Sequence, residues 1–286
     1  MPEGAEIRVM ADQMNKLLSG TTLIRFSIIN GPYLSNLKPR YVELRKQAAA
    51  LNKRVSDHPV KIDYVRNKGK YIYIQLSTSV DGKKLNSYIL CHVGMAGHWR
   101  MDQGDHTMVL LQYRKHDELS VLYYDDYRRF GNFYITNAAG VRQKLSELGP
   151  DVLSKEFTLA AFLEILANPH LQKRRIGELL MDQSVTSGVG NYMRADILYM
   201  CRLSPHRTVA SLSTTERTSL YKSIVHVSST SYAQNGTTIA TYRDVNAEKG
   251  DYVPVIYGKT KDPKGNPVKT ETISGRTMHW VPAVQK

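Results

Sequence analysis

Pro2 and Glu3 are the residues of this chain whose types and spacing are best suited to chemistry. We expect Met1 to be removed, which places the secondary amine of Pro2 directly beside a carboxylate. Because an α-amino group has a pKa near ~7.7–8, a sizeable fraction of it is unprotonated at neutral pH. Such an amine can attack an electrophilic carbon and form an iminium, a permanent cation that withdraws electrons. The pair therefore indicates covalent amine catalysis.

The same residues also fit an ordinary helix start. Proline is favoured in the first turn of a helix, and acidic side chains are favoured close behind it. The apolar residues that follow recur at helical spacing, namely Ile7, Met10, Met14, Leu17 and Leu18. A helix is thus predicted directly after the terminal residues under either interpretation.

A glycine-containing turn lies between two segments with helical spacing in the second half of the chain. It runs from Ser184 to Asn191 and contains Gly188 and Gly190. Backbone N–H groups that such a turn exposes at the start of a helix can bind phosphate. A helix pair joined by a glycine-containing turn is also a common way to pack two helices. Phosphate binding and plain packing are both open from these residues alone.

The charge of the chain favours a polyanionic partner. It has 286 residues, long enough for two ordinary domains, and 39 Lys and Arg against 26 Asp and Glu give a net charge of +13. Nucleic acid is the leading candidate, because cationic side chains that neutralise phosphates release counterions. A membrane surface is the competing one, but no apolar run approaches the ~18–20 residues of a membrane span. No signal peptide is evident, so we expect an intracellular protein, nuclear or cytoplasmic and not secreted.

Two cysteines, Cys91 and Cys201, exclude a disulfide framework and a four-cysteine zinc site. We therefore expect no metal and no other cofactor.

Two patterns divide the chain. Short runs separated by turn residues indicate an antiparallel sandwich or barrel up to about residue 135. Apolar residues at a spacing of three to four indicate helices after about residue 148, the last one opened by a Ser213–Glu216 capping box and stopped at Asn235-Gly236. The tail from about Asp251 returns to strand-like residues. The predicted strands are Thr22–Ile29, Val60–Val65, Tyr71–Leu76, Ser87–His92, Met108–Tyr113, Val121–Tyr124 and Asn132–Ile135, and the predicted helices are Glu156–Ala167, Ile176–Met181, Tyr192–Cys201 and Ser213–Ala233.

The residues around the glycine turn resemble the helix–two-turn–helix of the Fpg/Nei family of DNA glycosylases. The resemblance is carried by Leu180–Gln183 and Val189–Asp196. Pro2-Glu3-Gly4 with Glu6 is similar to the catalytic N-terminus of that family, and Leu148–Leu153 resembles the opening of its helical domain. The landmarks fall in order over nearly the whole chain, which favours the resemblance over chance.

The resemblance implies roles for further residues. Lys70 matches a lysine that anchors phosphate near the lesion, although a lone hairpin lysine is more often simply exposed. Met95, Arg128 and Phe130 match residues that fill the gap left by an extruded nucleotide, although a methionine here also suits core packing. Asn191 matches a phosphate-binding asparagine, and an acidic residue at the position of Asp196 usually supports the turn.

The end of the chain departs from the zinc-finger members of the family. Gly275-Arg276-Thr277 is kept, but Val281 and Val284 stand where cysteines would be, and Lys264 aligns with another. This resembles the zincless-finger, endonuclease VIII-like branch, and both a giant virus and a cell stay open as the source of the chain. Zinc supplies folding free energy to so small an element. We hypothesise that Val281, Val284 and Trp280 replace it by burying apolar area, at ~25 cal/mol per Å².

The resemblance implies an α+β fold: an N-terminal helix and antiparallel β-sandwich catalytic domain over 1–135, a linker over 136–150, a helical helix–two-turn–helix domain over 151–250 and a zincless β-hairpin finger over 251–286. It implies a bifunctional DNA glycosylase and AP lyase of base excision repair, a monomer whose partner is double-stranded DNA with oxidised bases or abasic sites. The residues expected to be catalytic are Pro2, Glu3, Glu6 and Lys70, and those expected to bind DNA are Met95, Arg128, Phe130, Lys173, Gly190, Asn191 and Arg276.

Substrate choice stays open. The zincless branch suggests oxidised pyrimidines, formamidopyrimidines and hydantoins, with nicking by β,δ-elimination. Arg128–Gly131 and Gly236–Thr238 also look like formamidopyrimidine enzymes that prefer 8-oxoguanine, and we expect the loop of about Thr237–Gly250 to decide. A non-catalytic nucleic-acid-binding protein is the alternative from another class, and it would leave Pro2 and Glu3 idle.

Overall fold

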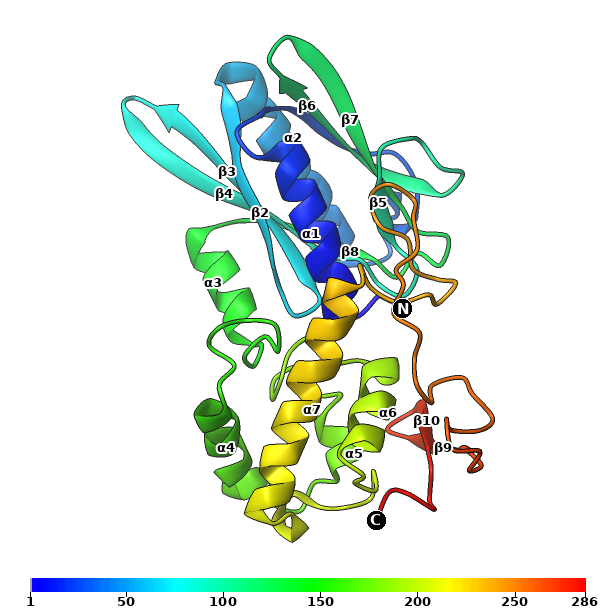
Figure 1. The fold of residues 1–286 in the computed structure, drawn as a ribbon. Helices are drawn as coiled ribbons and strands as arrows, with labels where there is room; N and C mark the ends of the chain where they lie inside the picture. Colours follow the sequence, from blue (N-terminus) through cyan, green and yellow to red (C-terminus); the bar gives the residue numbers. More distant parts are fainter. Residues whose placement is uncertain (1) are drawn as a thin grey trace. The chain divides into compact units, whose positions relative to one another are not determined.

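A computed structural model describes residues 2–286, which form two compact units. The first unit contains Pro2 and residues 6–146 and 239–249, and the second contains residues 3–5, 147–238 and 250–286. The expected α+β class is confirmed, with an antiparallel sheet, a helical part and a C-terminal hairpin (Figure 1). No helix in the described residues is both long and apolar enough to cross a membrane.

The first unit is built on one eight-stranded antiparallel sheet in the order β5-β7-β6-β1-β2-β3-β4-β8. The first and second strands pair through only two residue pairs, so the sheet turns there and its two halves face each other. The strands are β1 (Thr22–Ile28), β2 (Val60–Lys68), β3 (Tyr71–Val80), β4 (Lys83–His92), β5 (His98–Arg100), β6 (Thr107–Lys115), β7 (Glu118–Asp125) and β8 (Asn132–Asn137).

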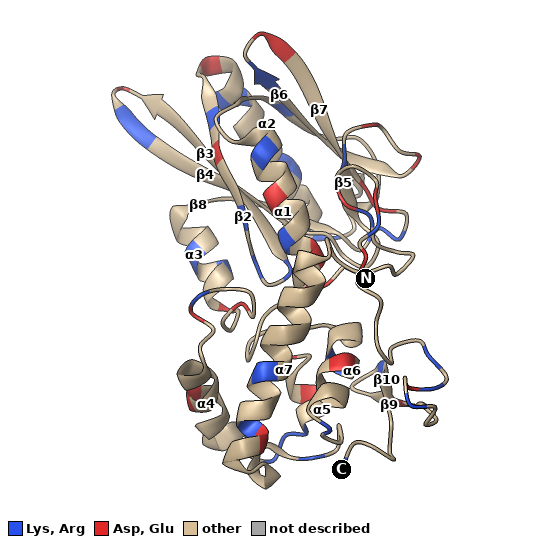
Figure 2. Cartoon of the chain, in the orientation of Figure 1, with Lys and Arg blue, Asp and Glu red and all other residues tan. Residues whose placement is uncertain are grey.

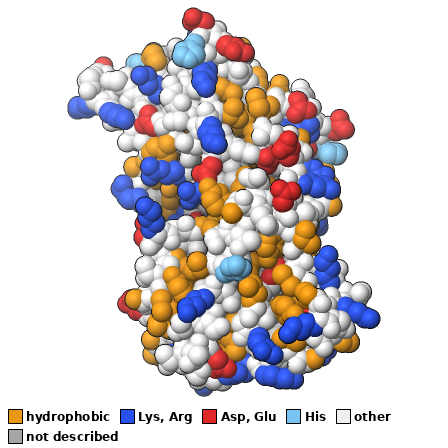
Figure 3. Space-filling view, viewed as in Figure 1, with side chains coloured by type: hydrophobic (Ala, Val, Ile, Leu, Met, Phe, Trp, Pro, Cys, Tyr) orange, Lys and Arg blue, Asp and Glu red, His pale blue; other side chains and the backbone are white. Residues whose placement is uncertain are grey.

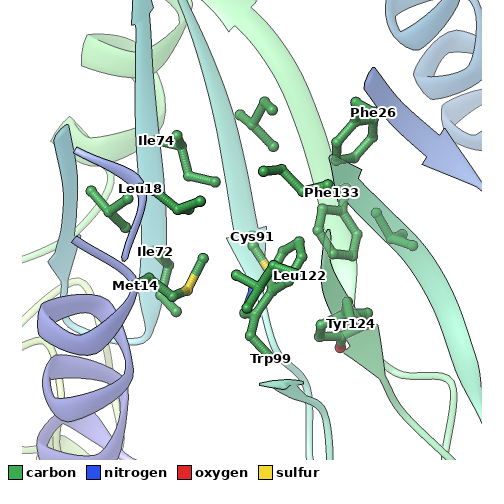
Figure 4. Close-up of a cluster of buried hydrophobic side chains, with 14 of the residues drawn as sticks. Met14, Leu18, Phe26, Ile72, Ile74, Cys91, Trp99, Leu122, Tyr124 and Phe133 are labelled. Carbon is green, nitrogen blue, oxygen red and sulfur yellow. The ribbon is translucent and has the colours of Figure 1, made fainter. Parts of the chain in front are cut away.

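The core of this unit lies between the two halves of the sheet. Ile72 and Ile74 from β3 and Cys91 from β4 face Phe26 and Leu122 from the other half (Figure 4). Alternate residues of a strand point to opposite faces, which explains why Ile72, Ile74 and Leu76 of β3 are all fully buried. The apolar stripe of α1 (Gly4–Leu18) closes this core, as its helical spacing predicts.

Two helices of this unit were not expected from the sequence. Residues 21–135 were predicted to be strands, yet α2 (Pro39–Asp57) lies among them and is preceded by a short 3-10 helix, η1 (Pro32–Leu34). Its Leu44 and Leu51 are buried in the core at helical spacing, and Pro39 occupies the first turn. The expected linker contains α3 (Ala138–Ser146), which packs on the outer face of β4.

The segment 239–249 belongs to the first unit although the sequence suggested the helical domain. Gln13 of α1 donates from Nε2 to Asp244 Oδ2 at 2.6 Å, and its Oε1 accepts from the backbone N–H of Val245 at 3.0 Å. Val245 is also part of the core. One side chain of α1 therefore fixes this segment, by a long-range contact that local sequence patterns do not encode.

The second unit is helical and ends in a β-hairpin (Figure 1). The predicted capping box is present, since Ser213 Oγ accepts from Glu216 N and the Glu216 carboxylate accepts from Ser213 N. The elements are α4 (Leu159–Ala167), η2 (Pro169–Leu171), α5 (Ile176–Leu179), α6 (Asn191–Met200), η3 (Val209–Ser211), α7 (Thr214–Ala233), β9 (Lys269–Ile273) and β10 (Arg276–Trp280).

Candidate active site and nucleic-acid interface

Pro2 and Glu3 precede α1 rather than starting it. The helix begins at Gly4, so Pro2 does not occupy its first turn, and the ordinary helix-start interpretation does not describe this proline. Both residues are buried, Glu3 with 2% of its surface exposed. Burying a carboxylate raises the free energy of the folded state unless the group is hydrogen-bonded. The hydrogen-bond partners of Glu3 therefore explain why it can lie there.

Glu3 lies at the N-terminus of α6 in the second unit. Its Oε1 accepts from the backbone N–H of Tyr192 at 2.9 Å, and its Oε2 accepts from Met193 N–H at 3.2 Å. The first N–H groups of a helix have no partner within the helix, and the helix dipole favours negative charge there. The start of α6 thus stabilises an ionised Glu3 and fixes its direction.

Glycines allow this close approach. A Cβ on Gly190 would lie 2.2 Å from Glu3 Cδ, and a Cβ on Gly4 would lie 2.8 Å from Gly188 Cα. Gly4 N–H also donates to Gly188 O at 2.8 Å. The expected role of Gly190 was DNA contact, and the structure gives it a further one, because any side chain there would displace the Glu3 carboxylate.

Asn191 begins α6 and is held by two neighbours. Its Nδ2 donates to the carbonyl of Thr277 at 2.8 Å, and its Oδ1 accepts from the guanidinium of Arg194 at 2.5 Å. Thr277 follows the exposed Arg276 in β10, so the structure brings Asn191 and Arg276 to the same place. Lys173 is exposed in the loop that precedes α5.

Arg194 is a residue that sequence reasoning missed. It is fully buried and also donates to the carbonyl of Gly177 at 2.9 Å. Burial is the main cause that lowers its pKa to about 10, with Arg276 acting in the same direction and Glu3 in the opposite one. The guanidinium stays charged at neutral pH and orients Asn191 from inside the unit. Its position one turn after Asn191 on the same helix was the available signal.

The resemblance implied that Asp196 supports the glycine turn, but the structure gives this residue other partners. Its carboxylate accepts from Tyr252 Oη at 2.9 Å and from the backbone N–H groups of Val255 and Ile256 at 2.8 and 3.0 Å. Burial raises its pKa. Asp196 therefore anchors the segment that leads to the hairpin, and the expectation was wrong because that partner lies about 60 residues away in the sequence.

Met95, Arg128 and Phe130 lie on two loops of the first unit that pack together. A Cβ on Gly94 would lie 2.7 Å from the backbone of Phe130 and Gly131, so only glycine permits the loops to touch. Met95 is half-buried, and Phe130 is 53% exposed with the Arg128 guanidinium 5.3 Å from its ring centroid. An exposed aromatic and a cation on one loop suit a stacked base better than a core.

Asp126 holds the second loop rigid. It is fully buried, and its carboxylate accepts from Arg128 N–H at 3.1 Å and Gly131 N–H at 2.8 Å. Tyr33 Oη adds a bond to the carbonyl of Gly131 at 2.6 Å. Such support lowers the conformational entropy that the loop would lose on binding a partner.

Lys70 lies in the turn between β2 and β3 and is 8% exposed, so the interpretation as an exposed hairpin lysine is wrong. It acts on His92, whose pKa is lowered to about 4 mainly by burial and then by Lys70. His92 is consequently neutral at neutral pH, and its Nδ1 accepts from Gly94 N–H at 3.2 Å. Lys70 is thus a buried cation beside a neutral imidazole.

Glu6 and Tyr242 form a second buried group in the first unit. Glu6 has no exposed surface, and Tyr242 is 1% exposed. Within the described residues the Tyr242 hydroxyl has no hydrogen-bond partner, which is unusual for a buried polar atom. Burial raises the pKa of this tyrosine, and the charges of Glu6 and Asp244 act in the same direction. Sequence reasoning missed Tyr242, which lies inside the segment expected to choose the substrate.

The hairpin end is packed by apolar contacts. Val281 is fully buried beside Ala195 and Ile256, and Val284 packs against the same cluster. Trp280 is 9% exposed and contacts His206, with ring centroids 5.3 Å apart. Among the residues that the structure describes, no group of three or more His, Cys, Asp or Glu side chains is placed to hold a metal ion. The side chains present do not fit zinc.

Comparison with known proteins agrees with this architecture over the whole chain. Models of the N-terminal, H2TH and C-terminal domains of formamidopyrimidine-DNA glycosylase match residues 1–133, 148–243 and 243–286. The enzyme of that name from Listeria monocytogenes is 31% identical, covering 79% of this chain and 82% of the relative. The one from Thermus thermophilus is 29% identical, covering 100% of this chain and 98% of the relative.

Solved structures show the same fold. The MutM (Fpg) protein of Thermus thermophilus has a TM-score of 0.79 at 26% identity and covers 99% of this chain and 98% of its own. A Lactococcus lactis Fpg variant in complex with Fapy-dG-containing DNA has a TM-score of 0.80 at 20% identity, covering 100% of both chains. The chain belongs to the formamidopyrimidine-DNA glycosylase family, whose members are DNA glycosylases with AP lyase activity. The endonuclease VIII-like branch and a giant-virus source stay predictions.

Proposed function

We propose that this chain excises oxidised bases from duplex DNA through the amine of Pro2 and then nicks the strand by β,δ-elimination. The observation that carries the proposal is the carboxylate of Glu3, bonded to the first N–H groups of α6 at 2.9 and 3.2 Å. This contact ties the residue next to the reactive amine to the helix whose Asn191 matches a phosphate-binding residue. Related Lactococcus lactis structures contain DNA with Fapy-dG, an oxidised pyrimidine or an abasic site.

The reaction begins once Met1 is removed and the damaged nucleotide is flipped out of the helix, at a cost of a few kcal/mol. The Pro2 nitrogen attacks C1′, and the glycosidic bond breaks with its electron pair leaving on the base. The Glu3 carboxylate takes the proton that the Pro2 nitrogen loses after bonding to C1′ and gives it to the sugar ring oxygen as the ring opens, while the departing base takes a proton from water. The product is an iminium between Pro2 and C1′. The hydrogen bonds from α6 hold the carboxylate in place for this transfer.

Elimination follows from the iminium. Its positive charge acidifies C2′, so loss of that proton expels the 3′ phosphate, and a second proton loss expels the 5′ phosphate. A one-nucleotide gap remains, and hydrolysis releases the Pro2 amine. The step uses no metal and no nucleotide cofactor. We assign Lys70 to the phosphate beside the extruded nucleotide, because a cation shielded from water attracts an anion more strongly than an exposed one does.

Met95, Arg128 and Phe130 are assigned to the gap left in the duplex. Phe130 stacks between bases and Arg128 pairs with the orphaned base, since arginine can donate two hydrogen bonds to a base edge. Lys173, Asn191 and Arg276 are assigned to phosphate contacts. Lys and Arg residues are spread along the chain in both units (Figure 2), and basic side chains lie on the face that Figure 3 displays, which suits a polyanionic partner. A duplex specificity is expected because all three gap-filling positions are present.

Glu6 was predicted to be catalytic, and we assign it, together with Tyr242, to recognition of the extruded base. A buried carboxylate accepts hydrogen bonds and a buried hydroxyl without a partner donates one, so the pair matches a base with adjacent N–H and C=O groups. Oxidised pyrimidines, formamidopyrimidines, hydantoins and 8-oxoguanine all carry such edges. Measuring the nicking of a panel of duplexes, each containing one of these bases, ranks the bases as substrates. If 8-oxoguanine opposite cytosine is cleaved best, the formamidopyrimidine-type preference holds instead of the pyrimidine one.

Borohydride trapping tests the covalent step. The wild type should form a stable protein–DNA adduct on abasic and oxidised duplexes, and mass spectrometry should place the adduct on Pro2 of a chain without Met1. Pro2→Gly keeps an amine, so Glu3→Gln is measured beside it. Trapping of Pro2→Gly at the wild-type level, or full activity with Met1 attached, contradicts the amine assignment. If the wild type binds DNA without cutting it, the enzyme hypothesis is wrong and the alternative of a non-catalytic nucleic-acid-binding protein holds.

A further inference from the structure

A cavity in the first unit lies outside every residue assigned to DNA. It has a volume of about 300 Å³ and lies between α2 and the ends of β4 and β8. Leu51 of α2 and Ile135 of β8 form a buried apolar floor, and Leu85 of β4 is 43% exposed at its side. A volume of this size is at the lower end of sites that hold a ligand or an inserted side chain. We call this cavity and the adjoining end of β4 the β4 groove.

The end of β4 offers an unpaired strand edge beside this cavity. Pairing of β4 with β8 stops at Ser87–Asn137, because the chain then leaves as α3, whereas β4 itself runs on to Lys83 with β3 as its neighbour. In the part of the chain that the structure describes, no strand pairs with residues 83–86 on this side. Alternate N–H and C=O groups there point outward, as at any strand edge.

The outer edge of the neighbouring strand β8 is covered by a side chain, whereas the edge of β4 at residues 83–86 is not covered by any part of the chain that the structure describes. On β8 the backbone N–H of Ile135 donates to Gln47 Oε1 of α2 at 3.1 Å, so a side chain occupies the place of a further strand. No described side chain does the same for β4 at residues 83–86. The free slot is about four residues long and continues the line of β8.

The rim of the β4 groove is basic. Arg54 is the charged residue that lines the cavity, and Lys83 points to the same face of β4 as Leu85, because residues two apart in a strand share a face. Neither side chain is paired with a carboxylate in the described residues. Figure 2 shows this start of β4 coloured as basic. An occupant with acidic side chains is therefore favoured over a neutral or basic one.

We propose that the β4 groove binds a short extended segment of a partner protein, in which an aliphatic residue is flanked two positions away by acidic residues. The segment pairs with the backbone of residues 83–86 as an added strand. Its aliphatic side chain enters the cavity between Leu51 and Leu85, and its acidic side chains reach Arg54 and Lys83. This docking site is separate from DNA chemistry and does not rest on the proposed excision activity.

A labelled peptide tests the proposal on the full chain. The probe is fluorescein-Thr-Glu-Thr-Leu-Thr-Glu-Thr, measured by fluorescence anisotropy against two controls, one with both Glu replaced by Lys and one with Pro after Leu. Proline removes a backbone donor and breaks strand pairing. We expect the Glu peptide to bind at least tenfold more tightly than either control. Hydrogen exchange should slow at residues 83–86 when it is bound.

Matched variants locate the site. Leu85→Glu and Arg54→Glu should each weaken binding at least tenfold, while Leu119→Glu, at the equivalent exposed start of β7 and 54% exposed, should bind as the wild type does. Thermal melting of each variant checks that it is folded. Arg54→Gln replaces Arg54→Glu, and Leu85→Gln replaces Leu85→Glu, where the charged variant does not fold. Equal binding of all three peptides, or unchanged binding by folded Leu85→Glu, overturns the proposal. So does self-association of the wild type that Leu85→Glu abolishes, since a second copy then fills the groove.

Discussion

Replacing Gly190 by alanine should displace the carboxylate of Glu3 without straining the backbone. The added Cβ would lie 2.2 Å from Glu3 Cδ and 2.4 Å from Oε1, whereas carbon atoms in contact are about 3.5–4.0 Å apart. The backbone of Gly190 is extended, with φ of −132°, so alanine is tolerated there conformationally. The whole effect of the substitution is therefore steric.

The magnitude follows from the two hydrogen bonds that are lost. The carboxylate must retreat by more than about 1 Å, which breaks bonds to Tyr192 N–H and Met193 N–H that now measure 2.9 and 3.2 Å. Each hydrogen bond to a charged group contributes about 1.5–3 kcal/mol, and water recovers part of this when the carboxylate moves outward. We expect a loss of about 3 kcal/mol in the free energy of unfolding of the second unit.

Activity should fall with stability. A catalytic group misplaced by about 1 Å can cost about 100-fold in rate, so single-turnover excision by Gly190→Ala should be slower by that order while duplex binding stays within a few-fold. Urea unfolding followed by far-UV circular dichroism gives the stability, and quenched-flow nicking of an oxidised duplex gives the rate.

A double-mutant cycle decides whether Glu3 is the cause. In Glu3→Ala the obstructing carboxylate is gone, so adding Gly190→Ala should cost less than about 0.5 kcal/mol, the limit within which independent effects usually add. If the two substitutions are instead additive in stability, Gly190 acts through some other contact. The assignment of its role to the Glu3 carboxylate would then be refuted.

Three further predictions follow from the structure. The pKa of His92 is lowered from 6.5 to about 4, so between these pH values the unfolded state binds one more proton than the folded state. The free energy of unfolding should therefore fall as the pH falls from 6.5 to about 4. His92→Gln should make the urea midpoint decline less over this range. Val281→Ala should destabilise the second unit by about 2 kcal/mol, with 57%-exposed Val253→Ala as control, and a chelator should change neither melting nor nicking. Asp126→Asn should loosen the loop of Arg128 and Phe130 and raise KM for duplex several-fold with little change in kcat, whereas a raised kcat would contradict this role.

Local patterns were sufficient for elements that depend on neighbours in the chain. The capping box at Ser213 and Glu216 starts α7 one residue later. The short runs between turn residues located β3 and β4, although each of these strands is about four residues longer than was predicted. The helix α2 was missed although Leu44, Ala48 and Leu51 recur at helical spacing. Pro39 at its start was the overlooked signal, because proline fits the first helical turn.

The candidate site divides in the same way. The residue types of Pro2, Glu3, Asn191 and the Arg128–Phe130 loop indicated the chemistry from the sequence alone, since amine catalysis and base intercalation need those groups. The partner of each group was decided by the tertiary structure. Asp196 bonds to a segment about 60 residues away instead of the nearby turn.

The sequence by itself determined the family, indicated the dipeptide that we propose to be reactive and gave the order of most strands and helices, because these reside in residue identity and short-range spacing. Only the tertiary structure placed Glu3 on the first N–H groups of α6, buried Arg194 behind Asn191 and enclosed Tyr242 with Glu6. The physical reason is that hydrogen bonding and burial depend on which groups meet in space. Residues 189 positions apart, such as Glu3 and Tyr192, meet only when the chain has folded.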